Sequence, residues 1–453
     1  MLTSLRRPRT FYKGLLALAL PIILQNLITL SLSMTDTLFL GFLGENEISA
    51  VTLANAPFFV ILLMIFGFQS GASVLISQYW GKKDLSTINR IVGLSLMIAF
   101  SITFVVSAVC WAFPRLITSF FTDDPLLIRL SADYMSYAAP AYLVNSVSQV
   151  YLGACRNMED PKSGMYIMCI AMLANTGLNW IFIFGNLGAP RMGVQGAAFA
   201  TFLSRVLELA ITAIYAWRNK RFPLMPRLMF RPGKALLSDY MRYAAPVVLN
   251  ETLWGLGTSL YPAIFGRMGA DVLAAYTVAM NVERIFNVTS FGLSNSACVI
   301  VGKEIGAGQM TKAYDACDTL KVISFLAGAL SGVLLFFCRW PISNFFEFPE
   351  STRAILRTVL MLYAVRLPIN NLSNTLVVGI LRAGGAVRYA MAVDIMPLWL
   401  FSLPLTTLFA FVFELPVLVV FLPIMVGETV KVLACLWKIR RRGWMHNLTR
   451  DIL

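Results

Sequence analysis

The sequence predicts an all-α integral membrane protein in which twelve transmembrane helices form two six-helix, pseudo-symmetric lobes around a central cavity. The first observation is the composition, because 58% of the 453 residues are hydrophobic and only 13% are charged. A water-soluble domain of this length needs more polar surface than that. The second observation is a series of apolar segments of membrane-spanning length, and the third is an internal repeat.

Twelve apolar segments follow one another along the chain. Each has about 20 residues or more, which is the length that a helix needs to cross ~30 Å of hydrocarbon. In order, the predicted spans are approximately 15–40, 48–78, 88–112, 131–155, 164–185, 194–217, 236–266, 272–299, 316–338, 354–380, 388–413 and 416–437.

The net charge of +14 is explained by where the basic residues lie. With the N-terminus in the cytoplasm, the loops on that side are basic, and the opposite loops are short and often acidic, as in "GENE" and "TDDP". This alternation follows the positive-inside rule. It predicts a multi-pass protein of the cell inner (plasma) membrane with both termini cytoplasmic. Because topology accounts for the positive charge, we expect no nucleic-acid partner. The basic residues assigned to the cytoplasmic side include Arg6, Arg7, Arg9, Lys13, Lys82, Lys83, Arg90, Arg156, Lys162, Lys303, Lys312, Arg382 and Arg388.

The second half of the chain repeats the first. At a shift of 225 residues, Pro21 aligns with Pro246 and the register continues without a gap as far as Gly81 with Gly306. The long polar loop between the halves predicts an N-terminal lobe over 1–217, a cytoplasmic linker over 218–234 and a C-terminal lobe with a basic tail over 235–453. Six spans per half place both repeats in the same orientation, so an axis along the membrane normal relates them.

The residue inventory excludes most enzyme chemistry. His446 is the one histidine and lies in the basic tail, no GxxxxGK[ST] motif is present, and the seven cysteines show no CxxC pairing. We therefore expect no enzymatic activity, no metal or disulfide role for the cysteines, and no cofactor other than a coupling ion. Two similar helix bundles around a cavity are the architecture of a transporter, which would draw its energy from an ion or substrate gradient.

Three carboxylates in the spans have no obvious partner on their own helix: Asp36, Glu251 and Asp394. Intramembrane acids of this kind are candidates for ion sites or proton relays. The other ionisable residues of the spans can find partners, Arg205 with Glu208 and Glu428 with Lys431 on one helix, and Glu283 and Arg284 on neighbouring helices.

Two prolines mark positions where the first helix of each half can bend, Pro21 and Pro246. A polar residue follows each proline by five residues, Asn26 in the first half and Glu251 in the second. A bend would free backbone carbonyls that can help to hold a cation.

The stretches "PIILQNLITLSLSMTDTLFLGFLG", "FGFQSGASVLISQYWGKKD", "MGVQGAAFATFLSR" and "FGLSNSACVIVGKEIGAG" resemble the multidrug and toxic compound extrusion (MATE) family of bacterial type. The resemblance covers essentially the whole chain. It implies a secondary active antiporter that exports organic cations or drugs in exchange for H⁺ or Na⁺ by alternating access.

The resemblance also implies a cation site in the N-terminal lobe, formed here by Asp36, Asn175, Asn179 and Thr201. The spacing of four places the two asparagines on one helix face. Some family members carry an aspartate at the position of Asn179, so the choice between H⁺ and a bound Na⁺ stays open, as does a purely structural role in which the asparagines bond across helices.

The C-terminal half matches the family less completely. Glu251 resembles an acid of the seventh span in the NorM-type branch, whereas that branch's acid in the tenth span is replaced by asparagines in "LPINNLSN". For Asp394, a role in attracting substrate and a structural role both stay open. Trp254 and Tyr261 are weaker candidates for a substrate cavity, where they could stack on an organic cation.

Two related functions stay open as alternatives. A lipid-linked sugar flippase of the same superfamily would share the architecture, although it needs more basic residues in the cavity, where only Arg205, Arg284 and Arg366 could serve. An exporter of an endogenous metabolite would use the same acids as a drug exporter. We expect small-molecule organic cations and membrane lipid as partners and a monomeric chain.

Overall fold

The computed structural model describes residues 6–450, and no β-strand occurs among them. The first half contains α1 (Arg9–Gly41), α2 (Glu45–Lys82), α3 (Leu85–Ala112), α4 (Pro114–Ser119), α5 (Pro125–Asn157), α6 (Pro161–Phe184), η2 (Asn186–Gly188) and α7 (Val194–Arg218). The second half contains α8 (Pro226–Met229), α9 (Lys234–Met268), α10 (Ala270–Gly306), α11 (Met310–Phe345), α12 (Glu350–Asn374), η3 (Thr375–Leu381), α13 (Val387–Met396), η4 (Pro397–Ser402), α14 (Leu403–Phe411) and α15 (Val417–Arg440).

Each of the twelve predicted spans lies in a long helix. The tenth span is α12 continued by the π-helical stretch η3, and the eleventh is α13, η4 and α14 without a break. Residues with known helix-starting roles begin several of them. The Asp124 side chain accepts a hydrogen bond from the backbone N–H of Leu126, and Pro125 occupies the first turn of α5, where its missing N–H costs nothing. The predicted count of twelve spans is confirmed for residues 6–450.

By length and composition, nine of the described helices are apolar enough to cross a membrane. The three other long helices, α5, α9 and the α12–η3 helix, carry more polar and charged side chains. Polar groups in a membrane helix need partners from neighbouring helices, because lipid offers none. These three helices therefore depend most on side-chain contacts with their neighbours.

The chain divides into two compact units. The N-terminal unit comprises Leu24–Ala72 and Asp84–Met241, and the C-terminal unit comprises the described residues up to Ile23, Ser73–Lys83 and the described residues from Arg242 onward. The start of α1 and the end of α2 thus belong with the second half of the chain. The predicted lobes, 1–217 and 235–453 with a linker over 218–234, follow the sequence repeat and stay a prediction.

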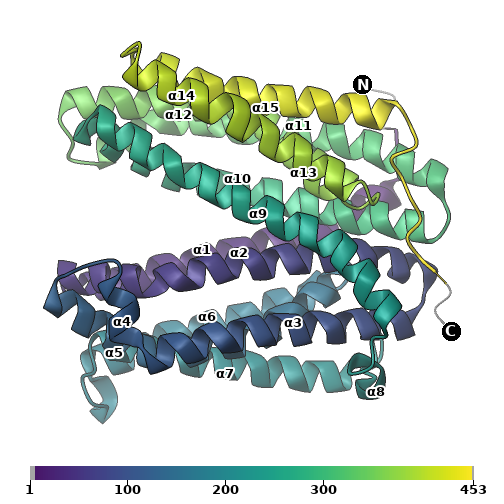
Figure 1. Ribbon diagram of the computed structural model, residues 1–453, viewed down its shortest axis with the longest axis horizontal. Coiled ribbons are helices and arrows are strands. Elements are labelled where there is room, and N and C mark those ends of the chain that lie inside the picture. The colour runs from purple at the N-terminus through teal and green to yellow at the C-terminus, as the bar shows by residue number, and fades with distance from the viewer. Residues whose placement is uncertain (1–5, 451–453) are drawn as a thin grey trace. The chain divides into compact units, whose positions relative to one another are not determined.

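The N-terminal unit is a bundle in which α3, α5, α6 and α7 run side by side (Figure 1). Its core at one level combines aliphatic and aromatic side chains from α2, α5, α6 and α7, including Phe58, Met135, Ile183 and Ala198, all at most 1% exposed. Gly93 on α3 lies against the backbone of Met229 at the short helix α8, where an added Cβ would have no room. Small residues thus let helices of this unit approach closely.

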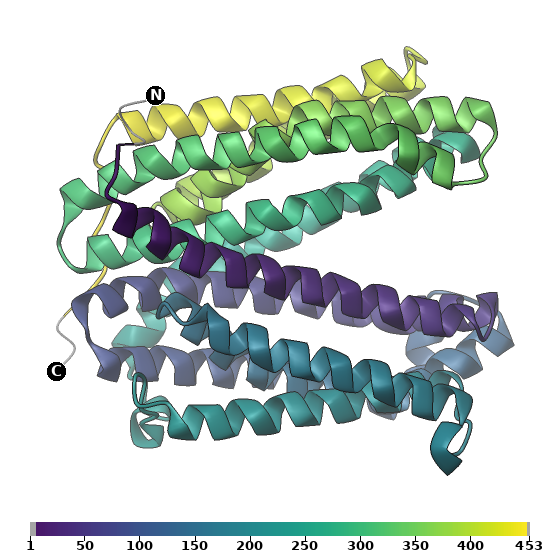
Figure 2. The same ribbon diagram turned by 180° about the vertical axis from the view of Figure 1, so that it is seen from behind.

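The C-terminal unit packs α10, α11, α12 and α15 around two apolar cores (Figure 2). The end of α2 belongs to it because glycines allow the backbones to touch. Gly306 on α10 lies against the backbone of Gln78, and Gly81 lies against the backbone of Lys303. The Gln78 side chain also donates to the carbonyl oxygen of Ala383 at 2.8 Å.

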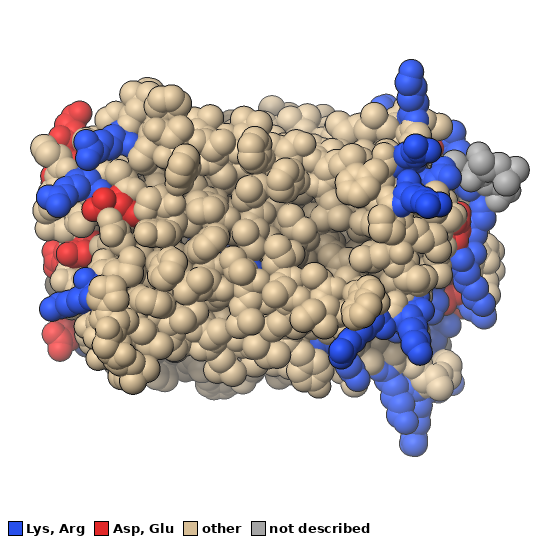
Figure 3. Space-filling model, turned by 90° about the horizontal axis from the view of Figure 1, so that it is seen from below, with Lys and Arg blue, Asp and Glu red and all other residues tan. Residues whose placement is uncertain are grey.

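Charged side chains gather at helix ends, and the surface between them is almost free of charge (Figure 3). Many large apolar side chains along the helices are exposed, among them Leu16, Leu173 and Leu330, each at 63–64%. Apolar exposure on this scale requires lipid around the helices. Pro21 and Pro246 lie inside α1 and α9, which continue through both positions, so the bends proposed there stay a prediction.

Candidate functional site

Asp36 lies near the end of α1 in the N-terminal unit, where its carboxylate meets an amide from α6. Three hydroxyls on the same helix donate to backbone carbonyls four residues earlier and therefore do not donate to Asp36: Thr29, Ser33 and Thr37. The Asn179 side-chain NH₂ donates to Oδ1 of Asp36 at 2.6 Å. Asp36 is half-buried, and Asn179 is fully buried.

A row of neutral polar groups continues from Asn179 into the unit. Its NH₂ also donates to Oδ1 of Asn175 at 3.0 Å, as the spacing of four on α6 predicts. The Asn175 NH₂ in turn lies 3.4 Å from the hydroxyl of Thr201 and 3.4 Å from that of Ser204, both on α7. The structure thus brings Asp36, Asn175, Asn179 and Thr201 together, and their function in ion binding stays a prediction. We call this group the Asp36 cluster.

The Asp36 cluster contains no basic side chain. Among the described residues, no Lys or Arg lies within ion-pair distance of Asp36, and Arg205 on α7 pairs with another carboxylate. Arg205 pairs with the fully buried Glu208 at 2.5 Å, as predicted, and Gln149 donates to the same carboxylate at 3.3 Å. Within residues 6–450, Asp36 therefore makes no direct ion pair.

The Asp36 cluster has the donor set of a hard monovalent cation. Carboxylate, amide and hydroxyl oxygens are its available ligands, and Oδ1 of Asn179 is buried without a hydrogen-bond partner. Buried acceptors almost always have a partner, so this oxygen is available to bind a cation or to accept a hydrogen bond. In the part of the chain that the structure describes, no three His, Cys, Asp or Glu side chains meet that could hold a divalent metal.

Glu251 in the C-terminal unit has a partner that the sequence did not reveal. Its carboxylate lies 2.8 Å from the guanidinium of Arg382, which is only 2% exposed. Arg382 follows η3 directly and is buried, so its side chain is not exposed to solvent as that of a loop residue would be, and its assignment to the cytoplasmic side stays a prediction. Glu251 has no partner on its own helix, as predicted, and its cation comes from the turn after η3.

Asp394 is also paired. Nζ of Lys431 on α15 lies 2.6 Å from one carboxylate oxygen, and the Asn250 NH₂ donates to the other at 2.9 Å. Lys431 was predicted to pair with Glu428, and that contact exists at 3.4 Å. The shorter contact, however, is the one that joins α15 to α13.

The remaining acid of this region, Glu283 on α10, finds its partner on a neighbouring helix, as predicted. Arg366 on α12 lies 3.3 Å from Glu283 and 3.9 Å from Glu428. The asparagines of the same helix bond to neutral groups, since the Asn374 NH₂ donates to Ser290 at 2.9 Å. The tenth span therefore contributes a cation, not an acid, to this region.

A pocket opens beside these charges in the C-terminal unit. Trp254 and Tyr261, the two aromatic residues singled out from the sequence, both line it, together with Asp394. The Trp254 side chain is 43% exposed, whereas Tyr261 is buried in the apolar core. Their contact with a substrate stays a prediction.

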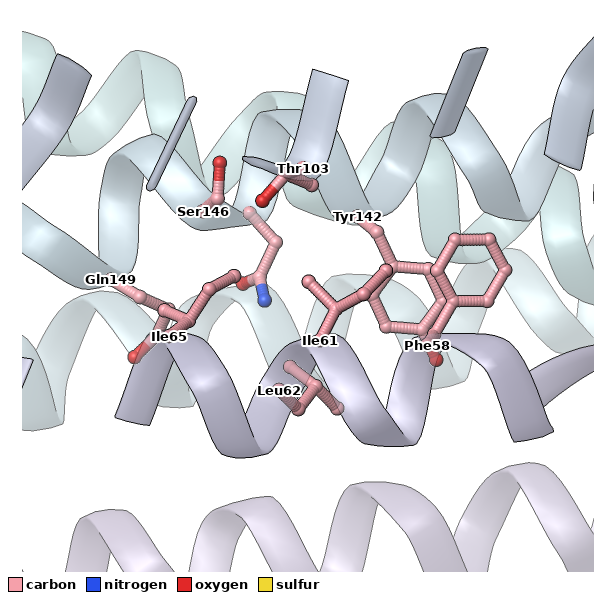
Figure 4. Close-up of a pocket in the computed structure, with 9 residues that line it drawn as sticks. Phe58, Ile61, Leu62, Ile65, Thr103, Tyr142, Ser146 and Gln149 are labelled. Atoms are coloured by element: carbon pink, nitrogen blue, oxygen red, sulfur yellow. The ribbon is translucent and has the colours of Figure 1, made fainter. Parts of the chain in front are cut away.

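A second pocket lies in the N-terminal unit and was not foreseen from the sequence (Figure 4). Phe58 and Tyr142 stack on one side of it with ring centroids 4.1 Å apart. Gln149, which donates to Glu208, lies on the other side, and the neighbouring Asn145 has a buried carbonyl oxygen without a partner. Single aromatic residues in a chain with 12% aromatics carry no signal that could have identified this cavity.

The sequence of this chain is similar to a protein-family model and to several named proteins. The MatE family model matches residues 21–181 and 246–408, which are the two halves of the repeat. A probable multidrug resistance protein NorM from Thermotoga maritima is 24% identical over 90% of this chain and 87% of its own length. Another NorM, from Mesorhizobium japonicum, is 28% identical over 88% and 87% of the two chains.

Solved structures share the fold. The structure of the Vibrio cholerae MATE transporter VcmN, solved for a mutant of that protein, matches with a TM-score of 0.87 and 18% identity, over 98% of this chain and 99% of that one. A MATE structure in the bent conformation matches with a TM-score of 0.86 over 95% of both chains.

Proposed function

Because the chain belongs to the MatE family of membrane transporters, which are not enzymes, we propose that it exports small organic cations, drugs included, in exchange for H⁺ or Na⁺ by alternating access. The names of its relatives support multidrug export. The observation that supports the exchange step is Asp36, an intramembrane carboxylate that is bonded to Asn179 and makes no direct ion pair with the described residues. Such a group can be neutralised by an ion from outside and recharged when the ion leaves.

The proposed cycle follows from that alternation. In the outward-open state, H⁺ or Na⁺ enters the Asp36 cluster and neutralises the carboxylate, and the bound organic cation is released. After the lobes rock, the ion leaves toward the cytoplasm, and the charge on Asp36 again favours an organic cation. A bend of α1 at Pro21 would couple ion entry to substrate release.

The alternative of a lipid-linked sugar flippase finds less support. Holding a pyrophosphate requires free cations. Of the three basic residues that could serve, Arg205 and Arg366 are paired with carboxylates, and Arg284 is exposed. An exporter of an endogenous metabolite remains the second candidate, because the same Asp36 cluster would serve it.

One experiment tests the exchange and identifies the ion. The chain is produced in a host that lacks its own drug exporters, everted membrane vesicles are prepared, and ethidium uptake is followed while a proton gradient or a sodium gradient is imposed separately. We expect uptake under one of the two gradients and none without a gradient. Absence of uptake under both would contradict the proposal, whereas uptake of a native metabolite but not ethidium would favour the second candidate.

We further propose that the chain is a monomer in the inner membrane with both termini cytoplasmic. On the face shown in Figure 3, Lys and Arg predominate at one end of the molecule and acidic and basic side chains mix at the other, which supports this orientation through the positive-inside rule. Labelling of single cysteines placed in the loop after α7 and in the loop after α14 tests it. A membrane-impermeant reagent applied to intact cells should reach only the second loop.

A further inference from the structure

The chain continues past α15 as a segment without helix, residues 443–450, which runs past helix ends of the C-terminal unit (Figure 1). We call it the tail. Its start is fixed by burial, since Trp444 is 1% exposed and its ring lies where a Cβ on Gly384 would have to be. The backbone N–H of His446 donates to the carbonyl oxygen of Gly384 at 2.9 Å. The tail is therefore anchored to the turn after η3.

The remainder of the tail binds the end of α2, within the same C-terminal unit. The side chain of Gln78, which is fully buried, supplies both a donor and an acceptor. Its NH₂ donates to the carbonyl oxygen of His446 at 3.2 Å, and its Oε1 accepts the N–H of Leu448 at 2.8 Å. One side-chain amide thus holds the main chain of two tail residues.

Two neighbours of Gln78 on α2 continue this contact to Arg450. The Tyr79 hydroxyl accepts the N–H of Arg450 at 3.1 Å, and Nζ of Lys82 donates to the carbonyl oxygen of Arg450 at 3.1 Å. Residues 446, 448 and 450 therefore present main-chain groups to α2, as alternate residues of an extended chain do. We call these four hydrogen bonds the α2–tail contact.

The first half of the chain contains a similar contact, made within that half. The side chain of Asn89 on α3, also fully buried, donates to the carbonyl oxygen of Pro223 at 3.2 Å and accepts the N–H of Met225 at 2.9 Å. Here too, one amide binds the carbonyl of one residue and the N–H of the residue two positions later. The segment that follows the sixth span is thus held by a helix of its own half.

The second half takes the corresponding amide from the other half of the chain. At the repeat shift of 225 residues, Asn89 aligns with Tyr314, whose hydroxyl accepts the N–H of Gly443 at 3.3 Å. The amide comes instead from Gln78 of α2, a helix of the predicted N-terminal lobe whose end, Ser73–Lys83, belongs to the compact C-terminal unit. The tail therefore joins a helix of the first half to the second half.

We propose that the tail is a latch, which holds the end of α2 in one access state of the transporter and releases it in the other. This inference rests on the proposed export by alternating access, in which the predicted lobes 1–217 and 235–453 rock as bodies and α2 moves with the first. The anchor at Trp444 is apolar and stays on the second half. The α2–tail contact consists of hydrogen bonds, which exchange with water at a small net cost, and it ends at the exposed Arg450.

The first test measures release on the purified full-length chain. Leu448→Cys replaces a half-buried side chain that lies against Gly385, so its rate of reaction with a maleimide reports how often the tail leaves. Adding Gln78→Leu should raise this rate about tenfold, because two hydrogen bonds of the α2–tail contact are lost. Lys82→Met, which removes one bond and no buried amide, should raise it about threefold. Asn89→Leu, which removes the matching amide of the first half, is the control. Rates that are the same in all these variants would overturn the latch.

The second test asks whether release is needed for transport. A short bismaleimide links Lys82→Cys to Arg450→Cys across the α2–tail contact, in everted vesicles that take up ethidium. We expect cross-linking to reduce uptake to the background without a gradient. Full uptake by a completely cross-linked chain would overturn the latch.

Two controls accompany the cross-linking. Tyr314→Cys with Arg442→Cys links two positions of the second half, where the unchanged guanidinium lies 5.3 Å from the ring centroid, and this link should leave uptake intact. The unchanged chain, whose seven cysteines are buried or half-buried, controls for the reagent itself. An equal loss in both linked pairs would show that the tail is a rigid cap and would overturn the latch.

Failure of the latch is distinguishable from failure of the export proposal. Export is judged from gradient-driven uptake by the unchanged chain, whereas release is judged from a labelling rate that needs no gradient. If the unchanged chain takes up no ethidium, the export proposal fails, and the labelling rates still decide whether the tail releases α2. If the unchanged chain and the chain linked across the α2–tail contact both take up ethidium, only the latch fails.

Discussion

The acids of the two units are held in opposite ways. In the Asp36 cluster one carboxylate faces neutral amides and hydroxyls, whereas in the C-terminal unit Glu251, Asp394 and Glu283 each lie within 3.3 Å of a buried or half-buried cation. A carboxylate with a resident cation needs no ion from outside. A carboxylate without one is the place where a transported ion can bind, so the difference favours the N-terminal unit as the site of ion binding.

The sequence repeat makes this difference sharper. At the shift of 225 residues, Asp36 corresponds to Tyr261, and Asn26 corresponds to Glu251. Each half therefore has its acid where the other half has a neutral residue. The two halves share a helical framework, but they carry charge at different positions along it, and the cavity-lining Tyr261 stands where the first half has its acid.

The largest effect is expected from removing the charge of the Asp36 cluster. Asp36→Asn should reduce gradient-driven export to the background of vesicles without the chain, because an amide cannot alternate between charged and neutral states. The amount of protein in the membrane should not change, since Asn can keep the bond to Asn179. Ethidium uptake and immunodetection measure the two quantities, and Asp123→Asn in an exposed loop is the control. Export that persists in Asp36→Asn would remove Asp36 from the mechanism.

The next largest effect is expected on stability, and only in the C-terminal unit. Glu251→Gln leaves Arg382 buried without a counter-charge, which costs about 3–5 kcal/mol in comparable cases. The melting temperature of the purified chain should fall clearly, and the double variant Glu251→Gln/Arg382→Gln should recover most of the loss. Glu350→Gln, which breaks an exposed pair with Arg357, is the control and should change stability by at most about 1 kcal/mol. An equal loss in the single and double variants would show that the pair is not coupled.

The two units also differ in how much of their polar contacts could be predicted from the sequence. The spans followed from hydropathy, because lipid requires long apolar helices whatever their packing. The Asp36 cluster followed from the family resemblance together with the i, i+4 spacing of Asn175 and Asn179, a local relation on one helix. Glu251 and Arg382 are 131 residues apart, and no local rule connects them.

Arg382 illustrates why the remainder could not be predicted. It ends an apolar run and precedes "AGGAVR", which in a sequence looks like the start of a basic loop. In the structure the Arg382 side chain is buried, and the compensating carboxylate comes from Glu251 on α9. Burial of a charge depends on a partner brought by tertiary packing, so the sequence alone could not show that Arg382 is buried and paired.

A smaller effect is expected from adding a charge to the Asp36 cluster. Asn179→Asp introduces a second carboxylate beside Asp36, and the more negative site should bind the coupling cation about tenfold more tightly, an effect of about 1.4 kcal/mol. The cation concentration that gives half-maximal export measures this change. Asn186→Asp, outside the cluster in η2, is the control. Unchanged or weaker cation dependence would indicate that Asn179 holds helices together and does not face the ion.

The smallest effect is expected at the far end of the same cluster. Thr201→Val removes one hydroxyl, but the Asn175 NH₂ keeps Ser204 at the same distance of 3.4 Å, so the amide row can survive the loss. One neutral hydrogen bond contributes about 0.5–1.5 kcal/mol, which predicts that the cation concentration for half-maximal export rises by a factor of about 2 to 13, nearer the lower value here. Thr201→Ser keeps the hydroxyl and should behave like the unchanged chain. If Thr201→Val abolished export as completely as Asp36→Asn, the hydroxyl would be an indispensable ligand. The hypothesis that the Asp36 charge is essential while its neutral neighbours are replaceable would then be wrong.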